Sequence, residues 1–286
     1  MASKNKGIFS QSFIVQNVGL VFAIVGVAML YSMVIRPQAR VDEALSQRIQ
    51  TTASGGETYA PQRSIFIILK DYEQQVCLTL MVWAGIILSY KLLLVAREQQ
   101  LLKVDFIPIE EGERIIPDDA LDYYKDLNMA IDRKKSWKDR LLPQVVLIGL
   151  HRFNSTRSIQ DVVNAIRERS EMAADEMESD LSLVRYIAWA IPSVGFIGTV
   201  RGIGDALAQA DKAIEGDISG ITNSLGLAFN STLIALLLSI VLMFMLHLLQ
   251  SRQEGFILDV DTYCREKMVG LMKIPIGNES RLQLPQ

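Results

Sequence analysis

Four apolar stretches, each long enough to cross a lipid bilayer, constrain the fold of this 286-residue chain more than any other feature. A membrane-spanning helix needs about 20 predominantly apolar residues. The stretches run over residues 12–35, 76–96, 183–207 and 225–249. Continuous apolar runs of this length predict helices that satisfy their own backbone hydrogen bonds in lipid. The chain is therefore predicted to be an all-α membrane protein with four transmembrane helices and long cytoplasmic helical extensions.

The distribution of basic residues predicts the orientation of these spans, because loops rich in Lys and Arg stay in the cytoplasm. The segment 97–180 contains thirteen Lys and Arg residues, whereas the loop 208–224 contains one, Lys212. The loop 36–75 contains five and is the shorter of the two flanking segments of the second span. We expect both termini and the middle segment to be cytoplasmic.

These boundaries divide the chain into six predicted parts, which alternate between membrane and water. They are a cytoplasmic N-terminus with the first span (1–35), a periplasmic loop (36–75), the second span (76–96), a cytoplasmic helical domain (97–182), the third and fourth spans (183–250), and a cytoplasmic C-terminal helix and tail (251–286).

The polar parts carry signals of their own. Pro37, the Ser-Gly-Gly of residues 54–56 and Pro61 predict a periplasmic loop without long regular structure. Ser158 followed by Asp161 resembles an N-terminal helix cap, and apolar residues then recur at helical spacing. We expect one long helix to run from this cap directly into the third span, and an amphipathic helix over residues 255–273.

The third and fourth spans each carry a stripe of small residues at helical spacing. Such stripes let two helix backbones approach closely in lipid. Pro192 also removes one backbone donor, so it predicts a freed carbonyl at Ala188 and a modest bend. The stripe of the third span comprises Pro192, Gly195, Gly198, Thr199 and Gly202, and that of the fourth comprises Ser224, Ala228, Thr232, Ala235 and Ser239.

Thr199 and Thr232 lie at the same predicted depth in the membrane. Each is seven or eight residues from the outer end of its span, which corresponds to roughly 10–12 Å at 1.5 Å per residue. A pair of hydroxyls at one level on two small-residue faces suits the solvation of a moving ion. The alternative is that each hydroxyl only bonds a carbonyl of its own helix.

The spans lack an acidic residue near their centres, and Asp205 at the end of the third span is the nearest. An ion route through a membrane normally includes a carboxylate, so such a route would need one from another subunit. Arg201 and Asp205 are four residues apart and are expected to pair. The alternative is that these two residues have a role in gating or in an outer vestibule.

Several other classes of protein find no support in the sequence. A net charge of −3 and the lack of basic clusters interleaved with aromatic residues argue against nucleic acid as a partner. The two cysteines and two histidines have no metal-ligand spacing. No phosphate-binding, metallopeptidase or nucleophile motif is present, so we expect no enzyme activity, metal or cofactor.

Two motifs in the last two spans resemble those of the MotA/TolQ/ExbB proton channel family. Residues 192–202 resemble its P-x-x-G-x-x-G-T-V-x-G motif, and residues 228–232 resemble its A-[FL]-x-x-T motif. Four spans with a short first periplasmic loop are most similar to the flagellar stator branch, while the motifs are similar to those of TolQ and ExbB.

The resemblance implies a pentamer of this chain in the bacterial inner membrane around a dimer of a single-span partner similar to MotB, TolR or ExbD. The partner would supply a membrane aspartate, and Thr199 and Thr232 would line the ion route to it. The implied function is a rotary motor driven by H⁺ or Na⁺. A membrane scaffold that holds an envelope complex without conducting ions is the alternative from a different class.

Overall fold

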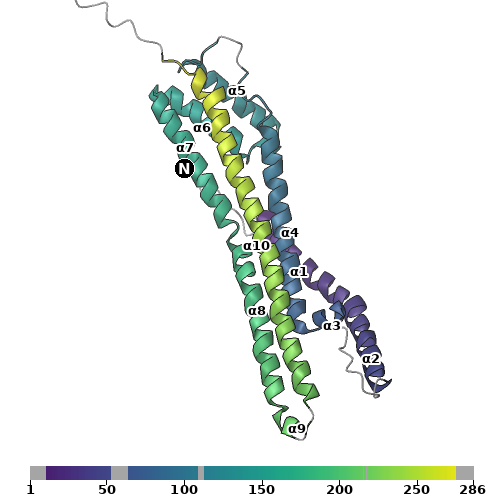
Figure 1. Ribbon diagram of the computed structural model, residues 1–286. Helices are drawn as coiled ribbons and strands as arrows, with labels where there is room; N and C mark the ends of the chain where they lie inside the picture. The colour runs from purple at the N-terminus through teal and green to yellow at the C-terminus, as the bar shows by residue number, and fades with distance from the viewer. Residues whose placement is uncertain (1–10, 53–63, 109–112, 215, 217, 275–286) are drawn as a thin grey trace, which may run out of the picture. The chain divides into compact units, whose positions relative to one another are not determined.

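The structure, a computed structural model, describes residues 11–52, 64–108, 113–214, 216 and 218–274, and helices dominate them (Figure 1). Those residues contain no strand, and Ile115 and Met272 form an isolated bridge. The helices are α1 (Gln11–Leu30), the π-helix η1 (Tyr31–Ile35), α2 (Arg36–Thr52), α3 (Ile65–Leu69), α4 (Tyr72–Leu101), α5 (Asp119–Arg133), η2 (Lys135–Trp137), α6 (Leu141–Thr156), α7 (Ile159–Ser179), α8 (Ser182–Leu207), α9 (Ala210–Ile214), α10 (Ser219–Lys267) and η3 (Val269–Leu271).

Four of the helical segments are long and apolar enough to span a bilayer, as the sequence predicted. They are Phe13–Leu45, Tyr72–Leu101, Ile159–Leu207 and Ser219–Leu271. The chain is therefore an all-α, multi-pass membrane protein. The chain divides into two compact units. One comprises residues 1–91 and 182–248, and the other comprises residues 92–181 and 249–286.

The predicted lack of regular structure after the first span is wrong for residues 36–52, because α2 continues the helix of that span. Pro37 lies next to the π-helical turn of η1, where the N–H of Arg36 bonds the carbonyl of Tyr31. A wider turn of this kind accommodates proline, which has no backbone N–H to donate. The helix is also tied to its neighbours, since Arg36 donates to Gln75 at 2.8 Å and Lys70 pairs with Glu43. Residues 54–56 and Pro61 lie outside the described residues.

The predicted single helix from Ser158 into the third span is interrupted. Ser158 caps α7 as predicted, because its hydroxyl accepts from the N–H of Asp161 at 3.3 Å. A tight turn at Asp180 and Leu181 then separates α7 from α8, and the N–H of Leu181 bonds the carbonyl of Glu178 at 3.1 Å. This three-residue bond replaces the four-residue spacing of an α-helix. The sequence shows no Gly or Pro there, so it gave no signal of the break.

The unit of residues 92–181 and 249–286 is built around α5, α6, α7 and the end of α10. Its core is apolar and includes the fully buried side chains of Leu142, Leu150, Phe153, Ile166 and Phe256. The amphipathic helix predicted over residues 255–273 is confirmed as far as Lys267, as the end of α10, which buries Phe256, Val260 and Cys264. Met268, which is also buried, follows the helix. Gly149 is where α6 admits Met268, since a Cβ atom there would lie 3.1 Å from the Met268 sulfur.

The other unit contains the hairpin of α8 and α10, which run side by side and are joined through α9 (Figure 1). Helix α4 packs on this hairpin, with the thiol of Cys77 3.6 Å from the carbonyl oxygen of Ile191. Val27, Tyr31 and Ile35 form a buried cluster with Leu78 and Val82 of α4. The hairpin and α4 together position the candidate site.

Candidate functional site

The small-residue stripes of α8 and α10 face each other, as their spacing predicts. A Cβ atom on Gly195 would overlap that of Ala235 and would lie 3.1 Å from the carbonyl oxygen of Ser231. A Cβ atom on Gly202 would lie 2.7 Å from that of Ala228. Since real Cβ atoms do not approach so closely, glycine is required at these crossings.

The carbonyl that Pro192 frees has a partner. Helix α8 continues through Pro192, and the hydroxyl of Ser239 on α10 donates to the carbonyl oxygen of Ala188 at 3.0 Å. The predicted free carbonyl is thus satisfied by the neighbouring helix, which is the usual remedy for proline in a membrane helix. Ser239 therefore serves the packing of the two helices.

Ser239→Ala is expected to destabilise the folded protein by about 0.6–1.7 kcal/mol, the range for hydrogen bonds between membrane helices. Unfolding in detergent titrated with denaturant measures the change. Ser193→Ala is the matched control, because the hydroxyl of Ser193 bonds only the carbonyl of Trp189 on its own helix, at 3.2 Å. Equal stability of the two variants would contradict a role for Ser239 across the helices.

Thr199 and Thr232 meet where the two stripes cross, and their hydroxyls are in contact. Thr199 also lies 3.0 Å from the carbonyl oxygen of Ala228, and Thr232 lies 3.1 Å from that of Gly195. Each hydroxyl thus reaches a carbonyl of the opposite helix. The two hydroxyls thus lie at one level of the hairpin. Bonding within a helix accounts for only one contact, Thr199 to Gly195 at 3.4 Å.

The two threonine hydroxyls have fewer protons than hydrogen-bonding contacts, so their hydrogen bonds can rearrange. A threonine hydroxyl has one proton to donate and two lone pairs to accept with. Two protons therefore serve four contacts, three to the carbonyl oxygens of Gly195 and Ala228 and one between the hydroxyls themselves. A cation that approaches the pair would find hydroxyl lone pairs free to coordinate it, and rotation of either hydroxyl would rebalance the bonds.

The carboxylate of Glu73, within the predicted periplasmic loop 36–75, also belongs to this region. Helix α4 begins at Tyr72, four residues before the predicted start of the second span, and includes Glu73 in its first turn. The Cγ atom of Glu73 would lie 3.1 Å from a Cβ atom on Gly198, the neighbour of Thr199. The buried stripe of α4 includes Gln74, Cys77, Ala84 and Lys91, so its helical spacing could have indicated that the helix starts earlier.

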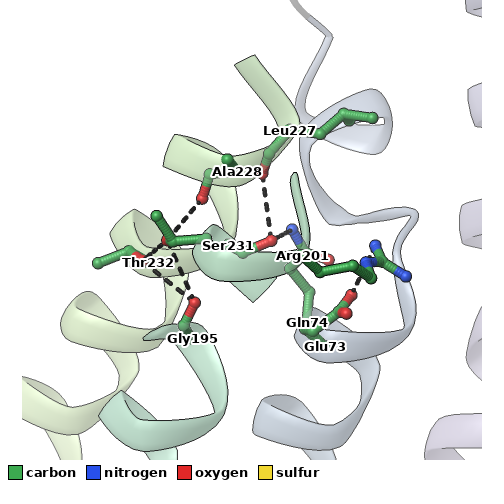
Figure 2. A network of polar contacts seen from close by, with 9 residues as sticks. Glu73, Gln74, Gly195, Arg201, Leu227, Ala228, Ser231 and Thr232 are labelled. Carbon is green, nitrogen blue, oxygen red and sulfur yellow. Dashed lines mark hydrogen bonds and ion pairs between the residues drawn. The ribbon is translucent and has the colours of Figure 1, made fainter. Parts of the chain in front are cut away.

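Arg201 has a different partner from the one predicted. Its guanidinium lies 3.1 Å from the carboxylate of Glu73 on α4, rather than bonding Asp205 on its own helix (Figure 2). A contact between helices that are far apart in sequence has no signature in residue spacing. The polar groups at this level therefore link three helices, because Gln74 also donates to the hydroxyl of Ser231 on α10 at 3.2 Å.

Asp71, just before α4, is a half-buried acid next to this cluster. Burial raises the pKa of its carboxyl group, against the opposing effect of Lys70 and Arg201 and with the support of Glu73 and Glu43. A raised pKa means that the charged form is disfavoured in the folded protein. The folded state is therefore less stable with Asp71 ionised than with a neutral group there.

Asp71→Asn is expected to raise the thermal unfolding midpoint at pH 8, and the gain should shrink as acidification protonates the wild-type carboxyl group. Fluorescence-monitored unfolding in detergent over a pH series measures it. Asp126→Asn, on an exposed face of α5, should show no such gain. A lower midpoint for Asp71→Asn at pH 8 would show that the attraction of Lys70 and Arg201 for the Asp71 carboxylate outweighs its burial.

Comparisons with known proteins address the region that contains both threonines. A search of curated proteins and a search of solved structures each found no match to this chain. The model of the MotA/TolQ/ExbB proton channel family matches residues 138–262, which include α6, α7, α8 and most of α10. The resemblance seen in the motifs of α8 and α10 is therefore confirmed over this wider region. Over residues 138–262, the chain is therefore similar to the MotA/TolQ/ExbB proton channel family.

Proposed function

We propose that this chain is the ion-conducting subunit of a rotary motor driven by H⁺ or Na⁺ across the bacterial inner membrane. The observation that carries the proposal is the contact between the Thr199 and Thr232 hydroxyls, within the region that matches the proton channel family. These residues would line the ion route, and the Gly and Ala residues of the two stripes would hold α8 and α10 close enough to form it.

The central part of the route requires a carboxylate from a partner. Helix α8 has no acidic residue before Asp205, and α10 has none before Glu254. The hydroxyls can solvate an ion but cannot take up its charge at neutral pH. A dimer of a single-span protein similar to MotB, TolR or ExbD, with one membrane aspartate, would complete the channel.

The surface of the hairpin supports assembly with other copies. Helices α8 and α10 expose large apolar side chains, among them Trp189, Phe196, Phe229 and Phe244 at 61% or more of their surface. Such residues must contact lipid or protein in the membrane. A ring of this chain, a pentamer by the family resemblance, would cover part of this surface. Both termini would lie in the cytoplasm, as the basic residues indicate.

A non-conducting scaffold is the competing function, and one observation favours it. The bonds from Thr199 and Thr232 to carbonyls of the opposite helix also suit a purely structural clasp. Reconstitution of the chain with its partner in proteoliposomes, followed by measurement of proton and sodium flux under a membrane potential, separates the two. We expect flux of one of these ions. A stable complex that conducts neither would support the scaffold.

A further inference from the structure

A second group of buried oxygen atoms lies beside the threonine pair, on α4. Gln74 is 1% exposed, and its amide nitrogen donates to the hydroxyl of Ser231. That hydroxyl in turn donates to the carbonyl oxygen of Leu227 at 3.1 Å, so it can only accept from Gln74 (Figure 2). The direction of this chain fixes the amide orientation and leaves the Oε1 atom of Gln74 as an acceptor.

This acceptor has no hydrogen-bond donor among the described residues, although it is buried. The Oε2 atom of Glu73, on the preceding residue, is likewise buried, and its partner is the guanidinium of Arg201, 3.1 Å away. An unsatisfied buried acceptor costs about 1–3 kcal/mol, and more for a charged group. The unsatisfied amide oxygen of Gln74 calls for an explanation, and a cation held by the neighbouring Glu73 would supply the missing partner.

The ion pair of Glu73 with Arg201 does not close the site. The Glu73 side chain is 11% exposed, whereas that of Arg201 is 48% exposed. An ion pair with one exposed member is held less firmly than a fully buried pair. Arg201 can therefore turn toward water at small cost and leave the carboxylate to a smaller cation. Other titratable groups close to Glu73 are Asp71 and Cys77.

We propose that Glu73 and Gln74 form an outer site for a monovalent cation, either H⁺ as hydronium or Na⁺. From this site the cation moves on to the hydroxyls of Thr199 and Thr232. The site adjoins the pair, because Glu73 packs on Gly198 and Gln74 bonds Ser231, each next to one threonine. Arg201 is the counter-ion that occupies the carboxylate when the cation is absent. This inference rests on the proposed function and adds a second carboxylate to the route.

Flux measurements on the reconstituted complex test the role of Glu73. Glu73→Gln should lower the flux about tenfold or more, because it removes the charge that binds the cation. The double variant Glu73→Gln with Arg201→Gln should stay equally low. Recovery to wild-type flux in the double variant would overturn the inference, because Glu73 would then only neutralise Arg201. Glu43→Gln, which alters a carboxylate paired with Lys70, is the matched control and should conduct normally.

The same experiment separates failure of this inference from failure of the proposed function. Flux that is lost in Thr232→Val but unchanged in Glu73→Gln overturns the outer site and leaves the channel. Absence of flux in the wild-type complex overturns the channel itself.

Chemical modification tests the site without its partner. A hydrophobic carbodiimide reacts with protonated carboxyl groups in membranes, and mass spectrometry identifies the modified residue. We expect Glu73 to be modified faster as the pH falls. Protection by Na⁺ but not by choline would identify sodium as the cation, and the lack of such protection would identify the proton. Modification that changes with neither pH nor Na⁺ would contradict cation exchange at Glu73.

Discussion

Thr232→Val is expected to lower ion flux through the assembled complex by about 10- to 100-fold, because a hydrogen bond to a charged group contributes roughly 1.5–3 kcal/mol. Valine has nearly the shape of threonine but cannot coordinate an ion. Thr232→Ser should retain most of the flux, since it keeps the hydroxyl in contact with Thr199 and with the Gly195 carbonyl. Flux is measured in proteoliposomes at equal amounts of assembled complex.

Thr222→Val is the matched control for this substitution. Thr222 is exposed near the start of α10, and its hydroxyl bonds the carbonyl of Ile218 on its own helix at 3.1 Å. It should conduct like the wild type. If Thr232→Val assembles normally and conducts like Thr222→Val, the hydroxyl pair is a structural clasp rather than part of the ion route.

Gly195→Ala is expected to destabilise the folded protein by about 1–3 kcal/mol, the usual cost of overpacking. The new methyl group would overlap the Cβ atom of Ala235 and force α8 away from α10. Because the two threonine hydroxyls meet one turn away, their contact should loosen as well. Denaturant unfolding in detergent measures the stability, and proteoliposome flux measures the effect on the site.

Two further variants show whether this effect comes from the crossing of the helices. Gly204→Ala introduces the same methyl group into α8 with nothing within 4 Å, so it should be neutral or slightly stabilising. Ala235→Gly combined with Gly195→Ala removes the overlapping atom and should recover much of the lost stability. A double variant no more stable than Gly195→Ala would contradict the close packing of the stripes.

The sequence was most informative about the surfaces that a membrane helix presents to lipid and to a neighbouring helix. Hydropathy predicted the four spans, and the spacing of Gly195, Gly198 and Gly202 predicted the face of α8 that packs on α10. Both signals are periodic and local, so a single chain reveals them. The equal depth of Thr199 and Thr232 followed from counting residues along two helices of a hairpin.

The partner of Arg201 and the position of Glu73 could not be predicted in this way. Glu73 lies outside the apolar run of the second span, and its place beside Gly198 depends on how α4 packs on the hairpin. Arg201 has an acidic residue at helical spacing in Asp205, yet it pairs with one from a different helix. Hydropathy similarly ended the first span at Ile35, although the helix continues into the polar α2.

The measurement that tests the account most directly is ion flux in proteoliposomes that contain this chain alone, the chain with its single-span partner, or the chain with a partner whose membrane Asp is replaced by Asn. We predict flux only in the second preparation, because α8 and α10 supply hydroxyls and packing surfaces but no central carboxylate. Flux through the chain alone, or undiminished flux with the Asn partner, would contradict it.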